Sequence, residues 1–184
     1  MTEGQAPDDP KFVIRPATHA DTQAIGRLGA LLVRIHHGFD AQRFIAATPR
    51  TEKGYGAYLA TQLDDPAVVM LVAERDGEVL GYTYAGVEAF DYMALRGPAG
   101  VLYDIVVDPD QRGQGVGRRL IESTIAELRV RGAPRVVLST AERNASAQRL
   151  FAAMGFRRTM IEMTRELPCG CAGQLPGSPW CSSG

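Results

Sequence analysis

The sequence predicts an α/β protein of the α+β type, with a mixed central sheet that carries helices on both faces. Three observations lead to this prediction. Short apolar runs alternate with stretches of helical period, the dipeptide Asp76-Gly77 joins two apolar runs as in a β-hairpin, and glycine or proline ends most stretches. A length of 184 residues suits one domain with a substantial core.

The expected elements begin with a strand and a helix. The first helix starts near Thr18, which forms a capping-box pattern with Asp21, and the third runs from Gly115 to about Arg131. Asn144 can cap a fourth helix, which closes at Gly155. The second helix is expected over residues 51–63, strands over 11–17, 68–74, 78–87, 101–107 and 135–140, and a last strand or hairpin over 156–166.

The bulk composition excludes several classes of protein. The formal net charge is −1, so no overall field draws the chain to nucleic acid or to an anionic membrane, and neither partner is expected. No run approaches the roughly 20 apolar residues that span a bilayer. The first residues lack the basic start and apolar run of a secretory signal, which predicts a cytoplasmic protein.

Two tails are expected to frame a domain over residues 11–166. Residues 1–10 and 167–184 are predicted to be flexible, because such polar or Gly/Pro/Ser-rich stretches bury too little to offset their ordering entropy. The cysteines are Cys169, Cys171 and Cys181, all in the second tail. Their spacing fits no common zinc pattern and no histidine lies nearby, so no metal site is expected.

The stretch from Val106 to Leu120 carries the main functional signal. A predicted strand ends there, and three alternating glycines lead into an amphipathic helix. Glycines allow a ligand to approach the backbone closely, and unpaired amides at a helix start suit a pyrophosphate. A Walker loop is excluded because Gly117 is followed by Arg118, and a dinucleotide fingerprint is excluded because its last glycine falls on Arg118 or Leu120.

Two motifs then agree with one family. Residues 112–117 match Arg/Gln-x-x-Gly-x-Gly/Ala, and residues 144–156 match Asn-x-x-Ala-x-x-Leu-Tyr-x-x-x-Gly-Phe except at Phe151. On these motifs the chain resembles the GNAT family of N-acetyltransferases from about Phe12 to Glu166. The resemblance implies the GNAT-like acyl-CoA N-acyltransferase fold, with a mostly antiparallel sheet, and acetyl-CoA as cosubstrate without a metal. It also implies a possible homodimer.

The same resemblance implies a reaction. An acetyl group would pass from acetyl-CoA to a primary amine of a small molecule, by direct attack in a ternary complex. Two alternatives stay open: transfer to a protein N-terminus or lysine, and a non-catalytic module that only binds acyl-CoA.

The resemblance also implies roles for the matched positions. The backbone of the strand end would pair with the pantetheine arm, and the loop amides would hold the pyrophosphate. Asn144 would bond the cofactor, or would only cap its helix. The implied cofactor-binding set is Val106, Val107, Arg112, Gly113, Gln114, Gly115, Val116, Gly117, Arg118, Asn144 and Phe151.

Two predicted catalytic residues, Tyr103 and Asp104, precede that strand end. The family commonly has a proton-donating tyrosine at the position of Phe151, which cannot donate a proton. Either Tyr103, Tyr82 or Tyr84 protonates the thiolate, or the thiolate leaves unassisted. Asp104 is a charge inside an apolar run, and it is the predicted base for the amine unless it only pairs with an arginine or backbone groups.

Strand alternation points Tyr103 and Asp104 to opposite faces unless a bulge intervenes. Three other groups carry open interpretations. His36 and His37 would line the acceptor pocket or would form a solvated helix end. Glu88 and Asp91 would attract a cationic acceptor or would be solvated. The nearby aromatic residues would wall a pocket or would cover the sheet, and they are Tyr82, Tyr84, Phe90, Tyr92 and Tyr103.

Overall fold

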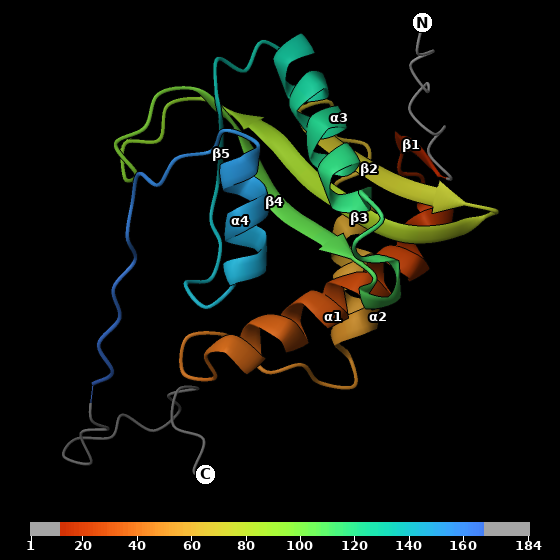
Figure 1. Cartoon of the computed structure of the whole chain (residues 1–184), viewed down its shortest axis with the longest axis horizontal. Coiled ribbons are helices and arrows are strands. Elements are labelled where there is room, and N and C mark those ends of the chain that lie inside the picture. The colour runs from red at the N-terminus through yellow and green to blue at the C-terminus, as the bar shows by residue number, and fades with distance from the viewer. Residues whose placement is uncertain (1–11, 168–184) are drawn as a thin grey trace, which may run out of the picture.

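The structure is a computed structural model that describes residues 12–167 (Figure 1). The segment predicted over residues 1–10 and the three cysteines lie outside the described residues. None of the described helices is both long and apolar enough to cross a bilayer. The elements are β1 (Val13–Pro16), α1 (Thr22–Phe39), α2 (Thr51–Ala60), β2 (Val68–Arg75), β3 (Glu78–Glu88), β4 (Ala99–Val107), α3 (Val116–Val130), β5 (Val136–Leu138) and α4 (Ala145–Ala153), with 3-10 turns at His19–Asp21 and Pro109–Gln111.

The strands form one sheet in the order β1-β2-β3-β4-β5. Neighbouring strands are antiparallel except β4 and β5, which are parallel, so the predicted mixed and mostly antiparallel sheet is confirmed. Asp76 and Gly77 turn the β2–β3 hairpin with positive φ angles of 52° and 82°. A two-residue turn with this geometry follows the twist of the strands that it joins.

Helices cover both faces of the sheet, as predicted (Figure 1). The inner stripe of α3 packs on one face, where Leu120 and Leu128 join residues of β2, β3 and β4 in one core cluster. On the other face, Ile25 and Leu28 of α1 pack against alternate residues of the same strands. Burial of both faces accounts for the almost continuous apolar runs of β2 and β3.

Helices α1 and α2 pack closely because glycines line their contact. A Cβ on Gly26 would lie 2.6 Å from the carbonyl oxygen of Glu52, and one on Gly56 would lie 2.7 Å from that of Thr22. One turn further along α1, a Cβ on Gly29 would lie 2.5 Å from Cε1 of the Tyr55 ring. The absence of side chains at these positions therefore brings α2, and with it Tyr55, against the sheet side of α1.

The last predicted strand is wrong. Residues 156–167 form no helix or strand, and Met160, Ile161 and Met163 are 76%, 80% and 90% exposed. Ile161 and Met163 share one side of an extended chain, but no described strand pairs with this segment, so they have no sheet on which to pack. The neighbouring β5 covers only residues 136–138 instead of the predicted 135–140, and it offers a short edge for pairing.

Candidate active site

The glycine loop before α3 presents a row of unbonded amides. Gly113 and Gly115 adopt left-handed φ angles of 77° and 82°, which glycine adopts without strain. The first amide of this region to donate a backbone bond is that of Arg119, which reaches the carbonyl of Gly115 at 3.1 Å. Within residues 12–167, the six amides of residues 113–118 have no hydrogen-bond acceptor. A helix start of this kind favours an anion.

Basic side chains accompany these amides. Arg112 and Arg119 are exposed, and Arg118 lies 3.7 Å from Glu122 one helical turn away. The Arg112 Nε donates to the carbonyl of Val107 at 3.4 Å, which holds that side chain over the end of β4. The loop therefore offers both backbone donors and positive charge to a diphosphate.

An opening in the sheet lies beside this loop. β5 pairs with β4 only from Gly100 to Leu102, whereas β4 continues to Val107. Val106 and Val107 pair with β3 on their other side. The second half of β4 therefore has a free edge toward β5, where an extended chain could add as a strand.

A bulge marks the residue at which β4 leaves β5. Tyr84 pairs with Asp104 and Ala85 pairs with Leu102, so Tyr103 is the extra residue. The bulge interrupts the alternation of side chains, and Tyr103 and Asp104 line the same pocket. The expectation that they face opposite sides holds only without a bulge, and the bulge is present.

Asp104 accepts two hydrogen bonds on one of its oxygens. The hydroxyl of Tyr55 donates to Oδ2 at 2.6 Å, and that of Tyr82 donates to the same atom at 3.0 Å. Oδ1 has no hydrogen-bond partner among the described residues, and it is not fully buried. Oδ1 is therefore the oxygen that opens toward the pocket. The partners of Asp104 are tyrosines, neither an arginine nor backbone groups.

Burial dominates the electrostatics of this carboxyl. Desolvation raises the pKa of Asp104 above its usual range, although the bonds from Tyr55 and Tyr82 and the nearby His36 oppose that rise. Desolvation and the neighbouring carboxylate also raise the pKa values of both tyrosines, so their hydroxyls stay protonated. A carboxylate with a raised pKa is a stronger base than an exposed one.

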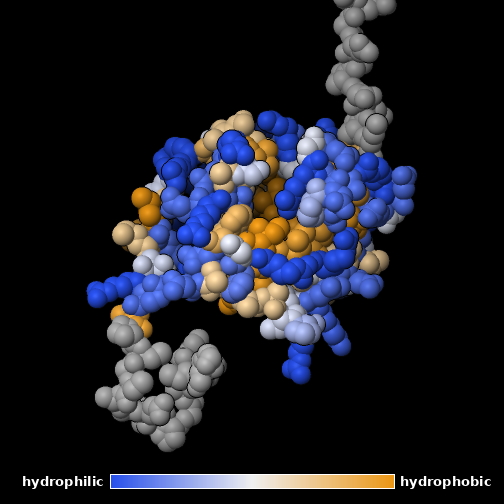
Figure 2. Space-filling view, turned by 60° about the horizontal axis from the view of Figure 1, so that its bottom comes forward, coloured by the Kyte–Doolittle hydropathy of each residue, from blue (hydrophilic) through white to orange (hydrophobic). Residues whose placement is uncertain are grey.

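The pocket beside Asp104 has a volume of about 200 Å³. Its polar groups are Asp104, Tyr103 and His36, whereas His37 is not among the lining residues, and a role of this pocket in acceptor binding stays a prediction. The His36 ring stays in place through Nδ1, 2.9 Å from the carbonyl of Leu32, and through edge contacts with Phe39 and Phe44. The apolar wall consists of Leu32, Val33, Phe44 and Ile45. Figure 2 shows apolar residues around a hollow on the face that carries α1.

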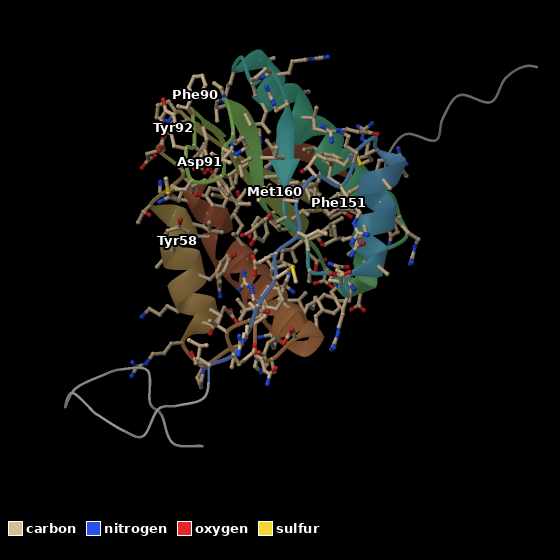
Figure 3. All side chains as sticks on the ribbon, turned by 90° about the vertical axis from the view of Figure 1, so that its left-hand side faces the viewer. Tyr58, Phe90, Asp91, Tyr92, Phe151 and Met160 are labelled. Carbon is tan, nitrogen blue, oxygen red and sulfur yellow. The ribbon has the colours of Figure 1, made fainter. Side chains whose placement is uncertain are left out.

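The remaining aromatic and acidic candidates divide into two groups. Tyr103 donates to Glu88 at 2.6 Å, and Glu88 also pairs with Arg96. Burial raises the Tyr103 pKa, with the Glu88 bond as a second cause. Phe90 and Tyr92 stack on each other in the loop after β3 and are 68% and 78% exposed, outside the pocket (Figure 3).

The two candidates near α4 hold structural positions. The Asn144 Oδ1 accepts the amide of Ala147 at 3.1 Å and caps α4, while its Nδ2 has no acceptor among residues 12–167. Phe151 is 6% exposed and packs edge-on against Phe156. Sequence reasoning missed Tyr55, Phe44 and Ile45, which the helix packing and the loop after α1 bring to Asp104.

Similar proteins place this arrangement in a family. A family model described as the acetyltransferase (GNAT) family matches residues 33–156. Mycothiol acetyltransferase of Thermobispora bispora is 39% identical over 99 residues, 54% of this chain and 33% of that protein. The ribosomal protein bS18-alanine N-acetyltransferase of Escherichia coli K12 is 42% identical over 60 residues, 33% of this chain and 40% of that one.

The chain thus spans between a third and two fifths of these relatives' length. Among solved structures, an aminoglycoside N-acetyltransferase in complex with CoA has a TM-score of 0.66 at 18% identity, over 90% of this chain and 100% of that chain. This likeness concerns the fold. The family model covers more than half of the chain, so the chain belongs to the acetyltransferase (GNAT) family.

Proposed function

We propose that this chain transfers an acetyl group from acetyl-CoA to a primary amine of a small molecule, by direct attack in a ternary complex. The observation that carries the proposal is the proximity of three features along one strand. Free amides follow the end of β4, the edge of β4 opens beside them, and Asp104 lies in a pocket just before that edge.

The loop fits the diphosphate of acetyl-CoA. Six amides without acceptors point from a left-handed turn and a helix start, and Arg112, Arg118 and Arg119 supply charge. The free edge of Val106 and Val107 supports pairing with the pantetheine arm. Asn144 Nδ2 is a further donor for the cosubstrate, and Gln114 and Val116 contribute amides to the row. Bound acetyl-CoA would supply an activated acyl group.

Asp104 fits the role of base toward the amine. A primary ammonium with a pKa near ~10 must lose a proton before it attacks a carbonyl carbon. Oδ1 of Asp104 is free to accept that proton, while Tyr55 and Tyr82 hold Oδ2 and orient the carboxylate. Backbone amides of β4 beyond the bulge would stabilise the negative charge that develops on the carbonyl oxygen.

The CoA thiolate needs less assistance to leave than the amine needs to attack. A thiol pKa near ~8.5 makes it a tolerable leaving group without a proton donor. Tyr103 is the proposed donor because it shares the pocket with Asp104 and keeps its proton. Its hydroxyl bonds Glu88, so it must turn away from Glu88 to act. Phe151 lies in the core and would contribute only packing.

The test combines a substrate screen with one variant. Thiol release from acetyl-CoA is measured across primary amines, peptides and antibiotics, and the product is identified by mass spectrometry. Asp104→Asn should lower kcat/KM by about 100-fold or more at neutral pH while the affinity for CoA stays within about twofold. The amide keeps an acceptor oxygen for the tyrosines, so the fold should persist.

The pH dependence gives the sharper result. The wild-type rate should rise as Asp104 ionises, at a pH above the usual range for an aspartate because its pKa is raised. In Asp104→Asn, the rate should instead climb about tenfold per pH unit toward the amine pKa, so the deficit is largest at low pH. A constant ratio of the two rates across pH would remove Asp104 from the mechanism. CoA binding without turnover of any amine would favour the non-catalytic module.

A further inference from the structure

The residues that line the acceptor pocket indicate which kind of amine it would bind. Four of its seven lining residues are apolar, and Asp104 is its single carboxylate. Leu32 and Val33 come from α1, and Phe44 and Ile45 come from the loop between α1 and α2. A ligand in this pocket therefore finds one acidic point and an apolar surface around it.

Two arginines contact the loop that forms the apolar wall. The guanidinium of Arg43 stacks over the ring of Phe44, with its Cζ 5.0 Å from the ring centroid. Arg43 is also paired with Glu162, which neutralises that carboxylate. At the start of the same loop, Arg143 donates to the carbonyl of Phe39 at 2.7 Å. Two positive charges thus hold the loop that forms the apolar wall.

Two further carboxylates, Glu88 and Asp40, are engaged by other groups. Glu88 pairs with Arg96 and accepts from Tyr103, and Asp40 accepts the amides of Gln42 and Arg43 within its own loop. A second ammonium in the pocket would lie against the apolar wall, because the lining holds no carboxylate besides Asp104. An unpaired charge in apolar surroundings loses hydration that nothing replaces.

From this arrangement we infer that the preferred acceptor is a primary monoamine on a compact apolar group, such as a short alkyl or arylalkyl chain, rather than a polyamine or an aminoglycoside. The ammonium meets Oδ1 of Asp104, and the apolar group lies on Leu32, Val33, Phe44 and Ile45. This inference rests on the proposed function, and it adds the substrate class.

The test compares two acceptors that differ by one charge. Hexylamine and 1,6-diaminohexane have the same chain, and the diamine has twice the number of reactive amines. The kcat/KM for hexylamine should exceed that for the diamine severalfold, because its terminal methyl gains contact with the apolar wall, whereas a second ammonium there loses part of its hydration without a partner. Equal values, or a preference for the diamine, would overturn the inference.

A substitution in the apolar wall should change the preference between the two amines. Ile45 is 76% exposed, so Ile45→Glu should fold, and its carboxylate should shift the preference toward the diamine by about tenfold. Val130→Glu is the matched control, because Val130 is 83% exposed at the end of α3 and outside the pocket. It should leave the ratio unchanged. A ratio that Ile45→Glu does not move would contradict the assignment of this wall to the acceptor.

Binding separates this inference from the proposed function. The affinities of the two amines are measured by calorimetry in the presence of CoA, without turnover. Tighter binding of hexylamine without any acetylated product would support the monoamine pocket and refute the acetyl transfer. Turnover of both amines with equal affinities would support the acetyl transfer and refute the monoamine pocket. Turnover confined to peptides would refute the small-molecule class.

Discussion

Gly115→Glu tests the anion site at the start of α3. Gly115 caps the helix with a φ of 82°, and a Cβ at this position would meet no atom within 4 Å. A left-handed conformation costs an L-residue roughly 1–2 kcal/mol, and a carboxylate at a helix start regains up to ~1 kcal/mol. Against a total stability of about 5–15 kcal/mol, the variant should fold.

The effect on binding is larger than the effect on folding. The new carboxylate would enter the row of amides over residues 113–118, where the diphosphate is proposed to bind. Two like charges about 4 Å apart repel by roughly 4 kcal/mol at an effective dielectric constant near 20. That energy corresponds to a loss of affinity of about a thousandfold. Added salt should recover part of the loss, because it screens the repulsion.

Gly132→Glu provides the matched control for this measurement. Gly132 also has a φ near 84° and open space around its Cα, and it follows the other end of the 15-residue α3. The two positions are separated by roughly 22 Å of helix. Calorimetric titration with CoA should show normal affinity for Gly132→Glu and almost none for Gly115→Glu. Similar affinities in the two variants would refute the anion site.

Three further substitutions test the supports of Asp104 and of the fold. Tyr55→Phe removes a bond that lowers the Asp104 pKa, so the acid limb of the pH–rate profile should move to higher pH; an unmoved limb would contradict the contact. Gly29→Ala should displace the Tyr55 ring, and adding Tyr55→Phe should then change the rate little further if both act through one contact. Arg15 lowers the Asp21 pKa to about 2, which stabilises the fold above an unfolded pKa near ~3.9 and is lost as the pH falls toward 2. Asp21→Asn should therefore lower the urea stability by roughly 2 kcal/mol at pH 7, and a difference that persists at pH 2 would refute the ionic origin.

Local signals in the sequence predicted most of the fold. The turn at Asp76-Gly77, the caps at Gly115 and Asn144, and the apolar stripe of α3 depend on neighbours within a few residues, and the structure confirms them. The strand or hairpin predicted over residues 156–166 failed although Ile161 and Met163 keep a period of two, because a strand also needs a partner strand, and the structure gives this segment none. A local pattern therefore predicts a strand only when the rest of the fold supplies an edge for pairing.

The site required contacts between distant residues, and the sequence indicated only part of them. Asp104 stood out as a charge in an apolar run, and the glycine loop stood out by its spacing. The hydroxyl that donates to Asp104 at 2.6 Å comes from Tyr55, 49 residues away, and no local pattern relates the two. The glycines of α1 were the available signal, since glycine in a helix interior costs stability and needs a packing reason.

The bulge at Tyr103 relates the free edge of β4 to the position of Asp104 in the pocket. In a regular strand, Tyr103 and Asp104 would point to opposite faces, and only one of them would reach the pocket. The same bulge lies directly after Leu102, the last residue of β4 that pairs with β5, and local bending at a bulge favours the divergence of the two strands. One inserted residue thus accompanies both the free edge proposed for the pantetheine arm and the carboxylate proposed for the amine. Because the two depend on the same distortion, a variant that restores regular pairing at Tyr103 should weaken CoA binding and amine turnover together.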